Sequence, residues 1–168
     1  MGGSRVTLLA IDPGRSYKGE ATIGVSLWWD NEWSEVKREA VSFEDLVSRL
    51  EIRDEGVYAT TPWLAYNDYP VHEVVIEDFV NNEKSRGGQR NGTSECIGAV
   101  EFACIKAGVP LTRQEPAALG PAKLHAPAGS WKELKHLRHE DSAYLHGYEF
   151  LVRRGDLQAA GLSSTLGA

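Results

Sequence analysis

Two short apolar runs in this sequence each end in an acidic residue, and this feature constrains the fold most. Residues 6–11 lead into Asp12-Pro13-Gly14, and residues 74–76 lead into Glu77. Short apolar runs that stop at turn residues are typical of buried strands. Because α/β proteins place their sites at the carboxyl ends of such strands, the pattern predicts a sheet with two carboxylates at one edge.

Five segments carry strand patterns, and their order predicts a mixed sheet. The predicted strands are residues 6–11, 19–29, 33–40, 74–76 and 110–114. Residues 30–32 form a tight connection, so the first three strands are expected to make an antiparallel meander. Helical segments follow the later strands, which predicts an α/β fold with helices on the faces of a five-stranded sheet.

Three segments carry helix patterns. The predicted helices begin at the caps Ser42, Thr93 or Ser94, and Ser130, and end near Arg53, Ala107 and Gly155. A chain of 168 residues with 42% apolar content suffices for one core, so a single domain over residues 1–156 is expected. Residues 157–168 are small and polar, and we predict a disordered tail there.

Composition limits the classes of partner. The net charge of −6 argues mildly against nonspecific coating of nucleic acid, although acids gathered in a metal pocket would not repel DNA once cations are bound. Cys96 and Cys104 lie too far apart on one predicted helix to pair, which favours a reduced, cytoplasmic protein. No apolar run approaches the roughly 20 residues of a membrane span, so no membrane partner is expected.

The predicted site contains three acids: Asp12, Glu77 and, on the last helical tract, Asp141. Like charges brought together need a counter-ion, and Mg²⁺, or Mn²⁺ in its place, prefers such hard oxygen ligands. Two such ions about 4 Å apart serve in-line phosphodiester hydrolysis. The joint pattern favours a metal-dependent phosphodiesterase, although each acid taken alone is also explained as a turn residue or helix cap.

The sequence around these acids resembles the RuvC family of Holliday-junction resolvases, in the ribonuclease H-like superfamily. Residues 8–14 (LLAIDPG) are similar to the opening motif of the family, and residues 74–77 (VVIE) to the strand that carries its glutamate. Residues 94–110 resemble the long family helix and its exit, and residues 139–143 (HEDSA) the segment with the last aspartate. The resemblance covers roughly residues 5–154, and it is closer to divergent bacteriophage proteins than to cellular members.

The resemblance implies a ribonuclease H-like fold and a magnesium-dependent endonuclease that cleaves branched DNA, most simply a four-way junction. It implies that Asp12 bridges two ions, that Glu77 and Asp141 hold one each, and that a water activated there attacks the phosphorus. Cleavage of opposite strands implies a homodimer. A phage protein of this kind would act in the host cytoplasm.

The last helix departs from the family pattern. Cellular members carry two acidic or histidine positions three residues apart there, whereas Arg138 and Tyr144 flank Asp141 at that spacing. The fourth ligand is therefore open among three candidates, which are His139, Glu140 and Asp78. We assign Glu140 to the metal and His139 to proton transfer, because imidazole is a poorer ligand for Mg²⁺.

A basic, glycine-rich segment follows the predicted glutamate strand. Residues 81–92 have the composition of a flexible phosphate clamp or of a plain solvated loop, and we favour the clamp. Lys123 lies where the resemblance implies a phosphate-contacting lysine, although an ordinary surface lysine explains it equally well. The predicted DNA-contacting residues are Arg15, Lys84, Arg86, Arg90, Lys123 and Arg138.

Other functions remain open at this point. A non-catalytic nucleic-acid-binding module of the same fold is the main alternative, and a nuclease for RNA–DNA hybrids or flaps is another, since fold does not select a substrate. An actin-like or sugar-kinase-like ATPase needs two related domains, and the sequence has neither a Gly-Lys-Ser/Thr phosphate loop nor a Gly-x-Gly-x-x-Gly motif. We therefore expect no nucleotide cofactor.

Overall fold

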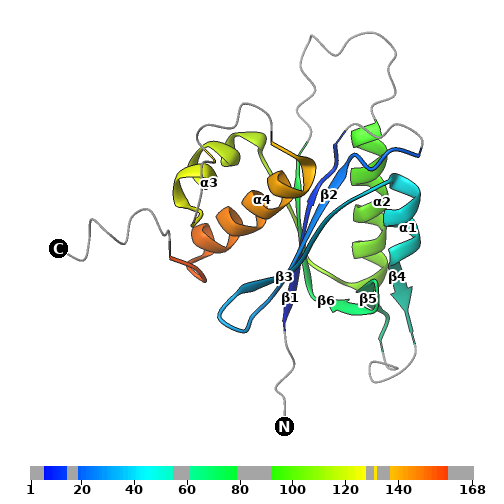
Figure 1. Cartoon of the computed structure of the whole chain (residues 1–168). Helices are drawn as coiled ribbons and strands as arrows, with labels where there is room; N and C mark the ends of the chain where they lie inside the picture. Colours follow the sequence, from blue (N-terminus) through cyan, green and yellow to red (C-terminus); the bar gives the residue numbers. More distant parts are fainter. Residues whose placement is uncertain are drawn as a thin grey trace, which may run out of the picture.

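A five-stranded mixed sheet with the strand order β3-β2-β1-β7-β8 forms the centre of the computed structural model (Figure 1). The structure describes residues 6–14, 19–54, 61–78, 92–127, 131 and 137–158. The strands of this sheet are β1 (Thr7–Asp12), β2 (Ile23–Trp29), β3 (Ser34–Val41), β7 (Glu73–Glu77) and β8 (Leu111–Gln114). The first three strands are antiparallel, and β7 runs parallel to both β1 and β8, which confirms the predicted sheet.

Different helices cover the two faces of this sheet (Figure 1). The helices are α1 (Phe43–Arg49), α2 (Gly92–Ala107), α3 (Leu119–His125) and α4 (His139–Arg154). Successive side chains of a strand point to opposite faces. Leu9 and Ile11 of β1 therefore join the core with α1 and α2, whereas Leu8 and Ala10 join the core with α3 and α4.

The prediction for residues 50–53 was wrong, because they form a strand and not the end of the first helix. The helix ends at Arg49, and β4 (Leu50–Arg53) pairs with β5 (Trp63–Tyr66), which pairs in turn with β6 (Tyr69–Val71). Asn67 and Asp68 form the turn between β5 and β6. Their φ angles are positive, at 46° and 72°, as the tight hairpin turns of antiparallel strands require. The result is a second, three-stranded sheet that we did not predict.

The segment between β8 and α4 contains helical structure that we also did not predict. A short 3₁₀ turn, Pro116–Ala118, runs directly into α3. Proline suits these positions, since Pro116 opens the turn and Pro121 lies in the first turn of α3, where no backbone donor is needed. The described part of the last helical tract begins at His139, nine residues beyond the predicted cap Ser130, and it stops at its C-cap, Gly155, as predicted.

Several predictions fall on segments that the structure does not describe or does not test. The predicted disorder of the tail is one of these, since residues 159–168 lie outside the described residues.

Cys96 and Cys104 are both buried free thiols, and burial raises the pKa of each to about 12. Among the described residues, no helix has the length and apolar character that a membrane span needs.

Candidate active site at the carboxyl end of the sheet

A row of polar side chains crosses the ends of the three parallel strands. In the pairing of β1, β7 and β8, Ile11 lies opposite Ile76, and Glu77 lies opposite Gln114. Asp12 and Glu77 therefore end neighbouring strands at the same level. Because Ala10, two residues before Asp12, faces α4, Asp12 faces α4 as well, and the same alternation brings Glu77 and Gln114 to that face.

Two glycines let the start of α4 and the turn after Asp12 come together. Gly24 is the pairing partner of Asp12 on β2, and a Cβ at this position would lie 1.8 Å from the carbonyl oxygen of His139. Gly14 has a φ of +49°, and a Cβ there would lie 1.7 Å from the carbonyl oxygen of Thr22. Only glycine permits such approaches to backbone. Gly24 therefore lets the start of α4 lie against β2 beside Asp12, and Gly14 lets the turn after Asp12 pack against the backbone of Thr22.

His139, the first residue of α4, faces Asp12. Its Nδ1 lies 3.5 Å from Oδ2 of Asp12, whose Oδ1 accepts a hydrogen bond from the Gly14 backbone at 3.1 Å. The Asp12 carboxylate raises the pKa of His139 above its usual value against the opposing effect of burial, and the charges of Glu140 and Glu77 act in the same direction as Asp12. The structure thus brings three of the predicted acids, Asp12, Glu77 and Glu140, within electrostatic reach of the His139 imidazole.

Glu77 is contacted by a histidine that our sequence reasoning did not assign to the site. The Nε2 atom of His146 lies 2.6 Å from Oε2 of Glu77, and its Nδ1 lies 2.8 Å from the side-chain nitrogen of Gln114. His146 has no exposed surface, and Gln114 is 6% exposed. A sequence signal for His146 existed, because residues seven apart on a helix share a face and His139 lies seven positions earlier.

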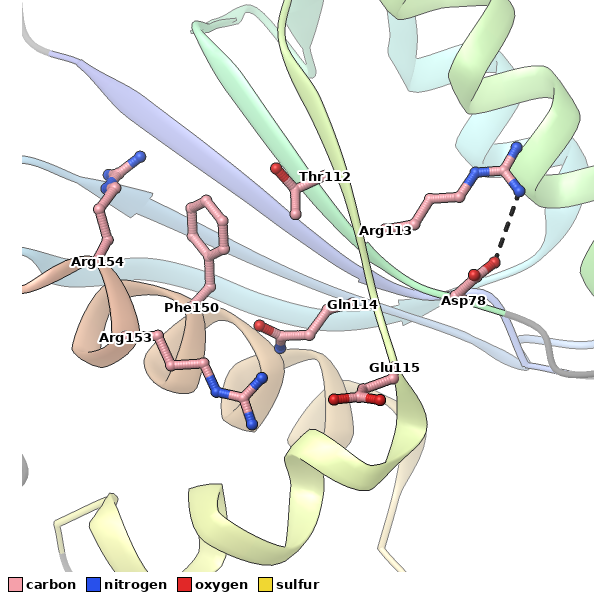
Figure 2. Close-up of a pocket in the computed structure, with 8 residues that line it drawn as sticks. All are labelled: Asp78, Thr112, Arg113, Gln114, Glu115, Phe150, Arg153 and Arg154. Atoms are coloured by element: carbon pink, nitrogen blue, oxygen red, sulfur yellow. Dashed lines mark ion pairs between the residues drawn. The ribbon is translucent and has the colours of Figure 1, made fainter.

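A groove beside this site runs along the edge strand β8 and encloses about 540 Å³ (Figure 2). Its lining residues are Asp78, Thr112, Arg113, Gln114, Glu115, Phe150, Arg153 and Arg154. Asp78, a candidate ligand, lies there 3.6 Å from Arg113. Each of the three arginines is paired with a carboxylate, so none of them supplies an unpaired positive charge that would bind an anion in the groove.

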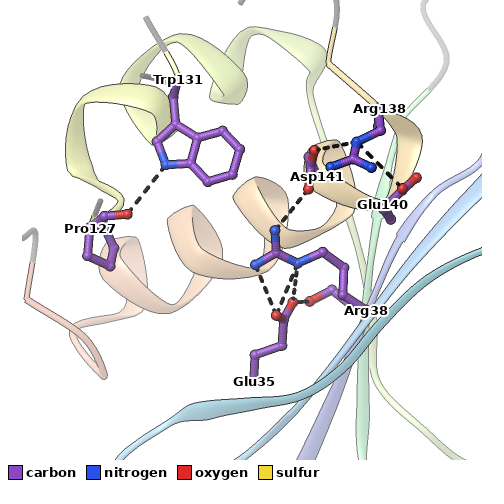
Figure 3. Close-up of polar contacts among 8 residues, drawn as sticks. Glu35, Arg38, Pro127, Trp131, Arg138, Glu140 and Asp141 are labelled. Atoms are coloured by element: carbon purple, nitrogen blue, oxygen red, sulfur yellow. Dashed lines mark hydrogen bonds and ion pairs between the residues drawn. The ribbon is translucent and has the colours of Figure 1, made fainter. Parts of the chain in front are cut away.

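Asp141 is not brought to the other two predicted carboxylates. It lies two residues beyond His139, which turns its side chain about 200° around the helix. Its Oδ1 is 2.9 Å from Nη1 of Arg38 on β3, and its Oδ2 is 3.4 Å from Nε of Arg138 (Figure 3). Arg38 is also paired with Glu35 at 3.0 Å. The predicted third ligand therefore belongs, in this structure, to an ion-pair network.

The donor atoms at the strand ends fit a hard divalent cation, although the described residues contain no group of three ligand side chains close enough to hold one. Asp12 and Glu77 present carboxylate oxygens from adjacent strands, which is the ligand type that Mg²⁺ takes. Glu140 follows His139 at the start of α4 and is only partly exposed. Two carboxylates with a third acid nearby can bind Mg²⁺ while waters complete its shell.

The predicted DNA-contacting residues are only partly described. Arg138 occupies the N-cap position of α4 with 79% of its side chain exposed, and it pairs with Glu140 at 3.8 Å as well as with Asp141. Lys123 lies on α3 and is partly exposed. Arg15, Lys84, Arg86 and Arg90 lie outside the described residues.

Comparison with known proteins supports the fold. No family model and no curated protein matches the sequence. A structure of T. thermophilus RuvC in complex with a Holliday junction substrate is similar to this chain, with a TM-score of 0.54, 16% identity, and coverage of 91% of this chain and 98% of that one. A second Thermus thermophilus RuvC structure has a TM-score of 0.50, 15% identity, and coverage of 91% and 99%. The chain therefore has the RuvC-like ribonuclease H fold, as predicted.

Proposed function

We propose that this RuvC-like chain is a metal-dependent DNA endonuclease that cleaves four-way junctions. The observation that carries the proposal is the placement of Asp12 and Glu77. They end two parallel, adjacent strands on the face covered by the start of α4, with His139 3.5 Å from Asp12. Carboxylates at the ends of parallel strands, with an imidazole beside them, supply what phosphodiester hydrolysis requires.

Asp12 and Glu77 would hold the cation, and Glu140, whose charge acts on His139, is a further acid at the start of α4. A divalent cation supplies charge neutralisation at a phosphate and lowers the pKa of water. Asp141 is a ligand in the sequence prediction, but its carboxylate is paired with Arg38 and Arg138, so the cation site that we propose does not include it. The number of ions, predicted as two, and the choice of Mg²⁺ or Mn²⁺ belong to this proposal.

His139 would hold or move a proton at the substrate. Its Nδ1 faces Asp12, which leaves Nε2 for a proton exchanged with the reacting oxygen. In the cation-free protein the Asp12 carboxylate raises the pKa of His139. The amino end of α4 lies at the same place, and its dipole favours the negative charge of a phosphate.

Branched DNA is the proposed substrate. One similar structure is RuvC in complex with a Holliday junction substrate. In this chain, Arg138 at the start of α4 and Lys123 on α3 are the described basic residues proposed to contact phosphates, together with Arg15 and the segment containing Lys84, Arg86 and Arg90. Symmetrical cleavage of a junction needs two sites that face opposite strands, so we also propose a homodimer.

A non-catalytic nucleic-acid-binding module is the second candidate. It is favoured by one observation, which is that Asp141 is engaged by two arginines and does not join Asp12 and Glu77. In that case the fold would bind branched DNA without hydrolysing it.

Cleavage of a labelled four-way junction decides between the two candidates. Duplex, flap and RNA–DNA hybrid substrates serve as controls, each with Mg²⁺, with Mn²⁺ and with chelator. We expect paired symmetrical nicks on the junction that disappear with chelator. Cleavage of another substrate would keep the nuclease and change its substrate, and binding without cleavage would support the second candidate. The mass of the protein–junction complex, measured by sedimentation, shows whether the protein binds the junction as a homodimer.

A further inference from the structure

Two buried side chains, Gln114 and His146, lead to the partly exposed carboxylate of Glu77. His146 on α4 lies between Glu77 on β7 and Gln114 on β8, with distances of 2.6 Å from Nε2 to Oε2 of Glu77 and 2.8 Å from Nδ1 to Nε2 of Gln114. The same Gln114 nitrogen lies 3.0 Å from the backbone carbonyl oxygen of His146. Glu77 and Gln114 are opposite each other in the β7–β8 pairing, so the sheet holds both partners of His146.

Gln114 determines which ring nitrogen of His146 carries the hydrogen. A backbone carbonyl oxygen only accepts hydrogen bonds, so the Gln114 atom that faces it is the amide nitrogen. This nitrogen carries two hydrogens and accepts none. Its bond to Nδ1 therefore makes Nδ1 the acceptor, and the ring hydrogen lies on Nε2, from which it is donated to Glu77.

A neutral donor orients a carboxylate without cancelling its charge. The bond from His146 uses one lone pair of Oε2, and a carboxylate has about four such positions, so Glu77 keeps its charge and Oε1 for a cation. Hydrogen-bond partners behind a metal ligand typically change metal affinity by about 10–100-fold. Such a role for His146 rests on the proposed function, because it requires that Glu77 holds the cation.

We infer that His146 and Gln114 are positioning residues that hold the Glu77 carboxylate in the orientation needed to bind a divalent cation. A merely structural role would affect the stability of the fold and leave the affinity for the cation unchanged. The two roles are separated by measuring Mn²⁺ affinity directly, with electron paramagnetic resonance of the free ion, beside thermal unfolding of each variant.

The main test compares His146→Leu with His146→Gln. Leucine removes the donor, and we expect Mn²⁺ binding to weaken about 10–100-fold. Glutamine can place its amide nitrogen near the position of Nε2, and we expect it to restore most of the affinity. In a Glu77→Gln background, His146→Leu should have no further effect. Unchanged affinity in a folded His146→Leu protein, or equal losses in both variants, would overturn the inference.

His125→Leu is the matched control, because it removes another histidine–glutamate pair, which joins His125 on α3 to Glu149 on α4. The Nδ1 of His125 lies 2.7 Å from Oε2 of the buried Glu149, away from the strand ends. This variant should lower stability and leave Mn²⁺ affinity unchanged. A similar loss of affinity would show that disturbing α4 is enough, which contradicts a specific role of His146.

A second measurement needs no variant. Nuclear magnetic resonance of the wild-type protein with ¹⁵N-labelled histidine reports the ring tautomer, and we expect the hydrogen of His146 on Nε2. A hydrogen on Nδ1 would overturn the inference. A wild-type protein that binds Mn²⁺ but cleaves no DNA would end the nuclease proposal and leave this inference standing, whereas one that binds no Mn²⁺ would overturn both.

Discussion

Asp141 on α4 and Arg38 on β3 form an ion pair at 2.9 Å that joins the last helix to the third strand. The Asp141 side chain is 11% exposed, and the guanidinium of Arg38 also stacks over the ring of Tyr144, with 3.9 Å between its Cζ and the ring centroid. A carboxylate in this position stabilises the seating of α4 on the sheet. The same seating places His139 beside Asp12.

Asp141→Asn should therefore lower stability and leave cation affinity unchanged. We expect the free energy of unfolding to fall by about 1–3 kcal/mol, since a charged hydrogen bond is removed from a mostly buried place. Urea denaturation and Mn²⁺ binding measure the two effects. A double-mutant cycle with Arg38→Gln should show coupling between the two residues. Weaker Mn²⁺ binding with unchanged stability would instead support the prediction that Asp141 is a metal ligand.

Asp12→Asn should abolish cleavage and retain junction binding. The substitution removes one carboxylate charge from the proposed cation site and keeps the size of the side chain. A gel assay measures cleavage, junction affinity measures binding, and circular dichroism shows whether the variant is folded. Asp30→Asn, at the exposed turn between β2 and β3, is the control and should cleave normally. Retained cleavage in Asp12→Asn would exclude Asp12 from the site.

Gly24→Ala should displace the start of α4. Its Cβ would lie 1.8 Å from the His139 carbonyl oxygen, and backbone on both sides leaves little room for adjustment. We expect a loss of about 1–3 kcal/mol in the free energy of unfolding, together with loss of cleavage. Gly98→Ala on α2 has nothing within 4 Å of the added Cβ, and it should raise stability by up to about 1 kcal/mol. Equal stabilities of the two variants would contradict the close packing at Gly24.

Glu39 on β3 should contribute stability that disappears in acid. Burial would raise the pKa of Glu39, but hydrogen bonds from Tyr66 at 2.5 Å and Arg49 at 2.7 Å, with the charge of Lys37, outweigh it and lower the pKa below the usual 4.5. A lowered pKa in the folded state means that the stabilisation is complete above 4.5 and is lost as the pH falls through the lower value.

The pH dependence is measured by comparing wild type with Glu39→Gln. Thermal unfolding from pH 7 to pH 3 should show the variant less stable at neutral pH, with the difference closing in the acid range. Glu32→Gln, in the exposed turn before β3, should follow the wild type throughout. A difference between wild type and Glu39→Gln that stays constant down to pH 3 would contradict the assignment.

Neutralising the basic segment after β7 should weaken DNA binding and flatten its salt dependence. Replacing Lys84, Arg86 and Arg90 by glutamine removes three positive charges from the predicted clamp. For duplex arms, the slope of log affinity against log salt should become less steep by about 0.9 for each phosphate that is no longer neutralised. Lys106→Gln, at the end of α2, is the single-charge control. An unchanged slope in the triple variant would rule out the clamp.

The strand ends that carry Asp12 and Glu77 were predictable because their signals are local. A strand buried on both faces is continuously apolar, and β1 and β7 have that pattern up to their acids. Gly155 ends α4 with a φ of 88°, the left-handed cap that glycine favours.

The second sheet was not predictable in this way. Residues 50–53 continue the helical spacing of α1 in the sequence, yet they pair with residues 63–66, a contact that no local pattern contains. The helical structure of residues 116–125 was missed because Pro116 and Pro121 mark turns as readily as first helical turns.

The amino-acid sequence by itself determined which residue types could do chemistry here and which strands would bring two of them to an edge. Only the tertiary structure decided which face of α4 meets them. Two close contacts set the rotation of the helix. Gly24 lies against the backbone of His139, and a Cβ at Gly147 would lie 2.6 Å from Nε1 of the Trp28 side chain. That rotation turns His139 and His146 toward Asp12 and Glu77 and turns Asp141 toward Arg38, because a helix presents residues two apart to opposite sides.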